Sequence, residues 1–162
     1  MLRAVLISTI LISGPFAFAK ELGDVTNLPL PRFVSMKADE GYARRGPSQG
    51  HRIDWVFKHR NTPLRITGEY EHWRRVEDVD GQGGWMHFRL LSGVRTVLVT
   101  QDQAILKRRD YEDSQVVAKL EKGVIGFLKE CSENWCKVSI EGKRGWLPKS
   151  HIWGVEADEI RN

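Results

Sequence analysis

The feature that most constrains the fold of this chain is a tryptophan motif that occurs twice. The first copy contains W-R-R-V (73–76) followed by G-G-W-M (83–86), and the second contains W-C-K-V (135–138) followed by R-G-W-L (144–147). The corresponding tryptophans are 62 and 61 positions apart. A repeat of this period indicates two tandem copies of a small domain.

Residues 1–19 are typical of a secretory signal peptide. A positive charge precedes an apolar run over residues 4–12, and small residues stand at Ala17 and Ala19. This pattern predicts cleavage between Ala19 and Lys20. The alternative, a membrane anchor, needs a longer apolar run to span a bilayer. We therefore expect a periplasmic or secreted protein that has no stable membrane insertion after cleavage.

The charge of the chain is mildly positive. Its 162 residues include 25 Lys and Arg against 21 Asp and Glu, a formal net charge of +4. Loss of residues 1–19 removes one Arg and leaves +3. The basic residues are spread over both copies, so the balance suits an anionic surface such as the cell wall. It is too weak to indicate a nucleic-acid partner.

The two cysteines, Cys131 and Cys136, flank S-E-N-W (132–135), which is expected to form a turn. An even number of cysteines in an exported chain indicates a disulfide. Their spacing matches neither a zinc site nor a C-x-x-C redox motif. We therefore predict a Cys131–Cys136 bridge across a hairpin, and we expect no metal site and no cofactor.

Short alternating segments separated by turns indicate an all-β chain. Each copy shows five short strands, and no window has a convincing helical period. A unit of roughly 60 residues buries only a small core, so a closed barrel without exposed edges is the expected architecture. The expected divisions are a linker at 20–34, a first domain at 35–92, a second domain at 94–156 and an acidic tail at 157–162.

The first strand of each copy is expected ahead of a long polar loop. In the first copy the strand is expected at 36–43 and the loop at 44–50. In the second copy the strand is expected at 103–106 and the loop at 107–115.

The ordered motifs resemble bacterial SH3 (SH3b) domains. The matching segments are A-R-R-G-P-S (43–48), T-P-L-R-I (62–66), W-R-R-V and G-G-W-M in the first copy, and E-K-G-V-I (121–125), W-C-K-V and R-G-W-L in the second. The second copy lacks the Gly-Pro and has Arg109 and Asp110 there. The resemblance covers residues 35–155. It implies two small SH3-like β-barrels that bind cell-wall peptides or other proteins, commonly as targeting modules beside a catalytic domain.

No catalytic motif accompanies the repeat. The five histidines lack the H-E-x-x-H spacing of a zinc peptidase. A Cys–His nucleophile needs a free thiolate, and both cysteines are predicted to be bonded. Glu77 and Asp78 lie between two valines beside a hairpin, which is expected of a solvated strand face rather than acid–base catalysis. We expect that the protein is not an enzyme.

Aromatic and basic side chains are the candidates for ligand contact. Trp85 and Trp146 each follow a glycine and are expected in the cores. In SH3-like barrels the tryptophan that starts the preceding strand lines the ligand groove, so the resemblance gives that role to Trp73 and Trp135. Arginines of the long loops form a solvated face or clamp the carboxylates of an anionic peptide. The candidate ligand-binding residues are Tyr42, Arg44, Trp73, Tyr111 and Trp135.

These observations favour an exported, non-catalytic binding protein of a Gram-negative-type periplasm. Its tandem SH3b modules are expected to recognise peptidoglycan peptides or the cell wall. The alternative is a protein–protein interaction scaffold, or an accessory to an envelope enzyme, that has no affinity for the wall. A hydrolase has no support in the sequence.

Overall fold

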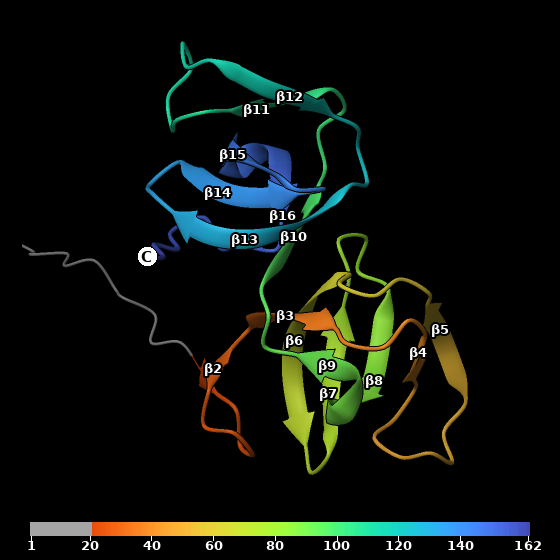
Figure 1. Cartoon of the computed structure of the whole chain (residues 1–162). Coiled ribbons are helices and arrows are strands. Elements are labelled where there is room, and N and C mark those ends of the chain that lie inside the picture. Colours follow the sequence, from red (N-terminus) through yellow and green to blue (C-terminus); the bar gives the residue numbers. More distant parts are fainter. Residues whose placement is uncertain (1–20) are drawn as a thin grey trace, which may run out of the picture.

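The computed structural model describes residues 21–162 and shows an all-β protein with two sheets of seven strands each (Figure 1). The predicted signal peptide, and its cleavage point between Ala19 and Lys20, lie outside the described residues. Within the described residues, no helix has the length and apolar character needed to cross a membrane.

The first sheet has the strand order β5-β4-β8-β7-β6-β3-β9, and all its pairs are antiparallel. Its strands are β3 (Arg32–Met36), β4 (Gly41–Arg44), β5 (Ile53–Phe57), β6 (Pro63–Tyr70), β7 (Trp73–Glu77), β8 (Gly83–His87) and β9 (Leu91–Ser92). A short 3-10 helix, η1 (Phe88–Leu90), precedes β9. β3 lies between β6 and β9 and pairs with both, so the first and last strands of this sheet's chain segment are neighbours.

The second sheet has the equivalent order β12-β11-β15-β14-β13-β10-β16. Its strands are β10 (Thr96–Val99), β11 (Ala104–Lys107), β12 (Val116–Leu120), β13 (Ile125–Cys131), β14 (Trp135–Ile140), β15 (Lys143–Pro148) and β16 (Ile152–Trp153). Here too a short 3-10 helix, η2 (Lys149–His151), precedes the last strand. The predicted all-β tandem of SH3-like units is therefore confirmed, although each sheet has seven strands where five were expected.

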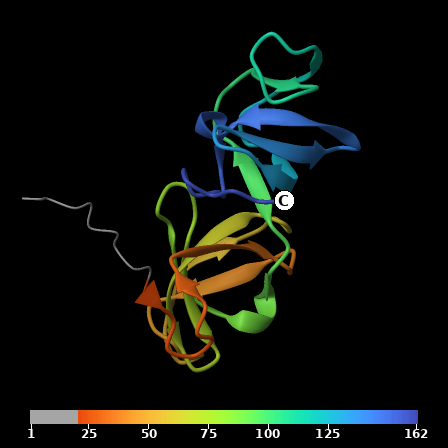
Figure 2. The same ribbon diagram turned by 90° about the vertical axis from the view of Figure 1, so that its left-hand side faces the viewer.

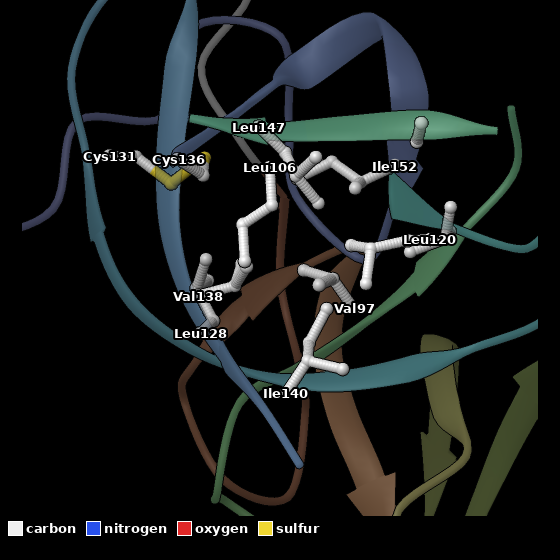
Figure 3. Close-up of a cluster of buried hydrophobic side chains, with 12 residues drawn as sticks. Val97, Leu106, Leu120, Leu128, Cys131, Cys136, Val138, Ile140, Leu147 and Ile152 are labelled. Atoms are coloured by element: carbon white, nitrogen blue, oxygen red, sulfur yellow. A yellow bond between two sulfur atoms is a disulfide. The ribbon is translucent and has the colours of Figure 1, made fainter. Parts of the chain in front are cut away.

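Each barrel has its own apolar core. The first core is built from residues of β3 to β8, with Met36, Leu64 and Met86 fully buried. The second is larger and includes Leu106, Val138 and Leu147 (Figure 3). Two separate cores within one short chain explain why the motif repeats: each copy has to supply its own inward-facing residues.

The expectation that Trp85 and Trp146 belong to the cores is wrong. Both side chains are only half-buried, whereas the residue after each, Met86 or Leu147, is fully buried. Side chains alternate between the two faces of a strand, and Met86 lies opposite Arg74 on the inner face. Each tryptophan therefore lies on the outer face of its sheet.

The glycine before each of these tryptophans is required by close strand approach. A Cβ atom on Gly84 would lie 2.5 Å from the Arg44 carbonyl oxygen, and one on Gly145 would lie 2.5 Å from the Lys107 carbonyl oxygen. Gly84 also has a positive φ of 147°, which L side chains rarely adopt. The Gly-Trp pair thus brings β8 against β4 and β15 against β11, and it presents the indole outward.

The start of the first domain differs from the prediction. The single strand expected at 36–43 is two strands, β3 and β4, with a bend between them. Residues 32–34 of the expected linker already belong to β3, which pairs with β6. Ahead of it, β1 (Glu21–Leu22) and β2 (Pro29–Leu30) pair with each other as a small hairpin. Hydrogen bonds from Val25 and Thr26 to the Glu69 carboxylate fix this hairpin to the barrel.

The predicted disulfide is confirmed. Cys131 and Cys136 are bonded and lie opposite each other in the register of β13 and β14, with both side chains in the second core. The bond joins the two strand ends that flank the turn at Ser132–Asn134, on the side of the core. It therefore fixes the turn that precedes Trp135.

The two barrels pack directly against each other. The Phe33 ring meets the Trp153 ring edge-on, with ring centroids 5.1 Å apart. The buried Thr96 hydroxyl donates a hydrogen bond to the Asn61 carbonyl oxygen at 2.8 Å. Figure 2 shows the C-terminal segment returning to this junction between the barrels. There Glu159 accepts two hydrogen bonds from the Arg95 guanidinium, each 2.9 Å long.

Candidate ligand-binding groove

A cavity of about 530 Å³ lies around Trp135 on the second barrel. We call it the Trp135 groove. Trp135 starts β14 and Pro148 ends β15, and the two residues lie directly opposite each other in the sheet register. The other lining residues come from three further segments: Glu112, Glu133, Asn134, Lys149, Ser150, Val155 and Ala157.

Local hydrogen bonds hold the walls of this groove. In the turn before β14, the Ser132 amide donates to the Trp135 carbonyl oxygen at 2.8 Å. The Lys149 amide donates to the Asn134 carbonyl oxygen at 2.9 Å, which joins η2 to that turn. On the other side, the Lys107 ammonium donates to the Glu112 carbonyl oxygen at 2.7 Å. The groove is thus a formed site between three tethered segments.

The C-terminal segment supplies one further wall. The Lys149 ammonium donates to the carbonyl oxygens of Ala157 and Glu159, at 3.0 and 2.7 Å. Cys131 and Arg161 also exchange backbone hydrogen bonds of 2.8 and 3.0 Å. The segment expected to be an acidic tail is therefore folded back onto the second barrel, where it borders the groove.

The groove combines an aromatic surface with negative charge. The half-buried Trp135 indole and Pro148 supply flat apolar contact, while Glu112 and Glu133 supply carboxylates at the rim. The one ammonium group, on Lys149, is already bound to backbone carbonyls. An indole face beside carboxylates suits an amino group carried on an apolar stem, because both the ring and the carboxylates attract a cation.

The corresponding position in the first domain is filled by aromatic rings. His87 occupies the register position of Pro148, and its ring lies 5.7 Å from the Trp73 ring in an edge-on arrangement. The His87 ring also stacks on Phe88, with centroids 5.0 Å apart, and His72 lies close to both. Burial lowers the pKa of His87, and the neighbouring Arg89, His72 and Arg74 lower it further. The His87 ring therefore packs where the second domain has its groove.

The candidate residues from the sequence lie at different places. Only Trp135 lines the Trp135 groove, and Tyr111 is an exposed neighbour of Glu112 on its loop. Arg44 lines a separate cavity on the outer face of the first sheet. Trp73 lines none of the cavities around residues 21–162 that are described here, and Tyr42 is an exposed side chain of β4. Their roles in binding stay predictions.

Among the groove residues that the sequence did not predict are Glu112, Glu133 and Pro148. The signal for Pro148 was present, because it follows Trp146 by two positions and therefore shares its outward face. The signal for Glu133 was its place next to Trp135 inside the disulfide-closed turn. Aligning the two copies would also have shown that Pro148 replaces His87.

Residues 21–162 contain no group of three or more His, Cys, Asp and Glu side chains arranged to hold a metal ion. Both cysteines are in the disulfide, so neither offers a thiolate for nucleophilic attack.

Comparison with known proteins identifies both units. The family model for the bacterial SH3 domain matches residues 37–93 and residues 102–154, more than half of the chain. No curated protein sequence matches.

Two solved structures from Trichomonas vaginalis show a weak likeness. They are NlpC2, at 8% identity over 76% of this chain and 48% of that chain, and NlpC1, at 10% identity over 86% and 51%. Each TM-score is 0.36, which is too low to carry an argument. This chain spans about half the length of each of these two proteins.

The two matched segments lie within the two barrels and contain the repeated Trp and Gly-Trp positions. The chain belongs to the bacterial SH3 domain family and contains two copies of that domain.

Proposed function

We propose that this protein is a non-catalytic binding protein of the bacterial cell envelope, and that its second domain recognises peptides of the cell wall through the Trp135 groove. The observation that carries the proposal is that Trp135 and Pro148, paired side by side in the sheet, line one cavity with Glu112 and Glu133. A peptide with an amino group on an apolar side chain matches that combination. Stem peptides of peptidoglycan include diamino acids, which have this chemistry.

An extracytoplasmic location supports the same proposal. Disulfides persist in oxidising compartments, and Cys131–Cys136 lies in the second core. The signal peptide predicted at residues 1–19 and the membership of a bacterial SH3 family point the same way.

A second candidate has an observation in its favour. The groove is lined by an indole and two carboxylates and by no arginine that would repel a cation. A lysine-containing peptide of an envelope protein therefore fits it as well. In that case the protein is an interaction scaffold or an accessory to an envelope enzyme. Retention on purified peptidoglycan separates the two candidates.

The test uses the mature protein and insoluble peptidoglycan. We expect the unmutated protein to sediment with the wall material, and we expect Trp135→Ala to reduce the retained fraction at least tenfold, as for other central aromatic contacts. Glu133→Ala removes an exposed carboxylate at the rim and should weaken retention without affecting the fold.

The matched control is Trp73→Ala, which removes the equivalent tryptophan of the first domain. It should leave retention close to that of the unmutated protein. If the unmutated protein stays in the supernatant, wall binding is wrong and the scaffold function leads. If both tryptophan variants lose retention equally while remaining folded, the Trp135 groove is not the specific site.

A further inference from the structure

We propose that the first domain carries a second and separate binding site, for oxyanion groups repeated along a polymer, centred on Trp85 between Arg44 and Arg75. This site lies on the outer face of the first sheet, on a different barrel from the Trp135 groove. The three residues all line one cavity of about 390 Å³. We call it the Trp85 site.

The sheet register places these three side chains in a row. Trp85 on β8 lies directly opposite Arg44 on β4, and on its other side it lies opposite Arg75 on β7. Directly paired residues point to the same face, so both guanidinium groups and the indole face outward together. Adjacent strands lie about 4.8 Å apart, so the two arginines stand about two strand spacings apart, one on each side of the ring.

The carboxylates in this cavity already have partners. Asp54 accepts hydrogen bonds from the Nε atoms of Arg45 and Arg52, at 3.2 and 2.7 Å. Glu77 accepts from the Nε atom of Arg65 at 2.8 Å. The cavity is lined by three arginines, Arg44, Arg45 and Arg75, and its two carboxylates are already bound by Arg45, Arg52 and Arg65, which leaves an excess positive charge.

That excess resides on the two arginines beside Trp85. Arg44 donates one N–H to the His51 carbonyl oxygen at 2.7 Å and forms no ion pair within residues 21–162. Arg75 also forms no ion pair in that part of the chain, and it is exposed. Both have N–H donors available for a ligand. A guanidinium fork matches carboxylate and phosphate oxygens, and it also stacks on aromatic faces.

The second domain has a tryptophan between two basic residues in the same arrangement, but there both basic side chains are bound within the domain. Trp146 lies opposite Lys107 and opposite Lys137, at the positions of Arg44 and Arg75. The Lys137 ammonium pairs with Glu130 at 2.9 Å and lies 5.8 Å from the centre of the Trp146 ring. Lys107 is bound to the Glu112 carbonyl oxygen.

The carboxylate that closes this second arrangement is absent from the first domain. Glu130 pairs in register with Lys137, whereas the residue that pairs with Arg75 is Gly68. Arg75 beside Trp85 thus has no carboxylate partner within residues 21–162, whereas Lys137 beside Trp146 is paired with Glu130. The arrangement around Trp146 serves as a control within the same molecule.

A polymer fits the Trp85 site better than a single anion. Each exposed ion pair contributes little, because solvent and salt screen it. Two arginines that each hold one group of the same chain gain from the high effective concentration of the second group. The shared chemistry is a phosphate or carboxylate repeated along the chain.

The experiment titrates the mature protein separately with polyphosphate and with poly-glutamate, and it follows the indole N–H signals of Trp85 and Trp146 by NMR. The signals are assigned with Trp85→Phe and Trp146→Phe. We expect at least one polymer to shift the Trp85 signal in a salt-sensitive manner while Trp146 stays in place, and the polymer that does so identifies the oxyanion. Arg75→Ala should weaken that binding about threefold to tenfold.

The matched control is Arg60→Ala, which removes an exposed guanidinium paired with Asp39 elsewhere in the first domain. It should leave the affinity near that of the unmutated protein, and Arg75→Lys should recover only part of the loss. No shift at Trp85 with either polymer, equal shifts at Trp85 and Trp146, or equal losses in Arg60→Ala and Arg75→Ala would overturn the proposal. Trp135→Ala should leave this binding intact, so the outcome is independent of the Trp135 groove.

Discussion

Glu69 is the residue that holds the N-terminal hairpin to the first barrel. Its carboxylate, which is 1% exposed, accepts hydrogen bonds from the amides of Val25 and Thr26 and from the Thr26 hydroxyl, at 3.1, 2.9 and 2.7 Å. It also pairs with Arg32 at 2.6 Å. Burial by itself would raise the pKa of Glu69, but these hydrogen bonds outweigh it and lower the pKa to about 2.

This shift predicts a loss of stability in acid. The folded-state pKa lies below the ordinary value of 4.5, so the contribution of Glu69 is fully present above about pH 4.5. It is lost as the pH falls toward 2, and its size is on the order of 3 kcal/mol. Urea unfolding at a series of pH values should show this decline.

Glu69→Gln should flatten the decline and lower the free energy of unfolding at neutral pH. Glu159 also has a lowered pKa: burial opposes the shift, and the hydrogen bonds and charge of Arg95 outweigh it. The variant should therefore keep the part of the acid dependence that belongs to Glu159. An acid dependence identical to that of the unmutated protein would contradict this role of Glu69.

Single residues show where prediction from sequence succeeds and where it stops. Trp135 could be predicted as a groove residue because its motif repeats and the resemblance supplies a role. A tryptophan after a glycine suggests a core position for Trp85, but side chains alternate along the strand, so the burial of Met86 turns Trp85 outward. The contact between Glu69 and Thr26 spans 43 positions, and no local pattern encodes such a distance.

The β13–β14 hairpin is the element on which the Trp135 groove depends. The disulfide closes it at one end, and the backbone bridge from Cys131 to Arg161 ties the C-terminal segment to the same point. Trp135 stands at the first position of β14, directly before Cys136. The hairpin therefore connects the second core, the groove and the chain end.

Replacing both cysteines by alanine should lower the free energy of unfolding by about 2 kcal/mol, because the open loop gains entropy in the unfolded chain. Thermal or urea unfolding measures the change. Reduction of the unmutated protein with a thiol reagent should cause a similar loss and is the natural comparison. If neither treatment moves the midpoint, the bridge does not stabilise this domain.

Element boundaries were predicted best where glycine and polar turns punctuate the chain. The strands β7, β8, β14 and β15 were anticipated from the tryptophan motifs and their hairpins. The bend that separates β3 from β4 was missed, because no glycine or proline interrupts the segment from Met36 to Glu40. The fold of residues 157–162 is not evident from the sequence, since two of its partners, Cys131 and Arg95, lie 30 or more positions away.

At the scale of the whole molecule, the two domains share a strand order and differ in what they leave open. The first fills the position of the groove with His87 and exposes Arg44, Trp85 and Arg75. The second contains the Trp135 groove, and its lysines beside Trp146 are bound within the domain, Lys137 to Glu130 and Lys107 to the Glu112 carbonyl oxygen. Because the barrels pack through Phe33 and Trp153, both sites belong to one connected body. The repeat thus specifies the fold twice, whereas the groove that we propose for binding lies in the second copy.

The most direct test of this account is a titration of the mature protein with a soluble stem peptide from peptidoglycan, followed through the tryptophan indole N–H signals. The account predicts that the Trp135 signal shifts and saturates while the Trp73 signal stays in place. An unchanged Trp135 signal at about millimolar peptide, where even weak binding is visible, would contradict it. A saturating shift at Trp73 with none at Trp135 would contradict it as well.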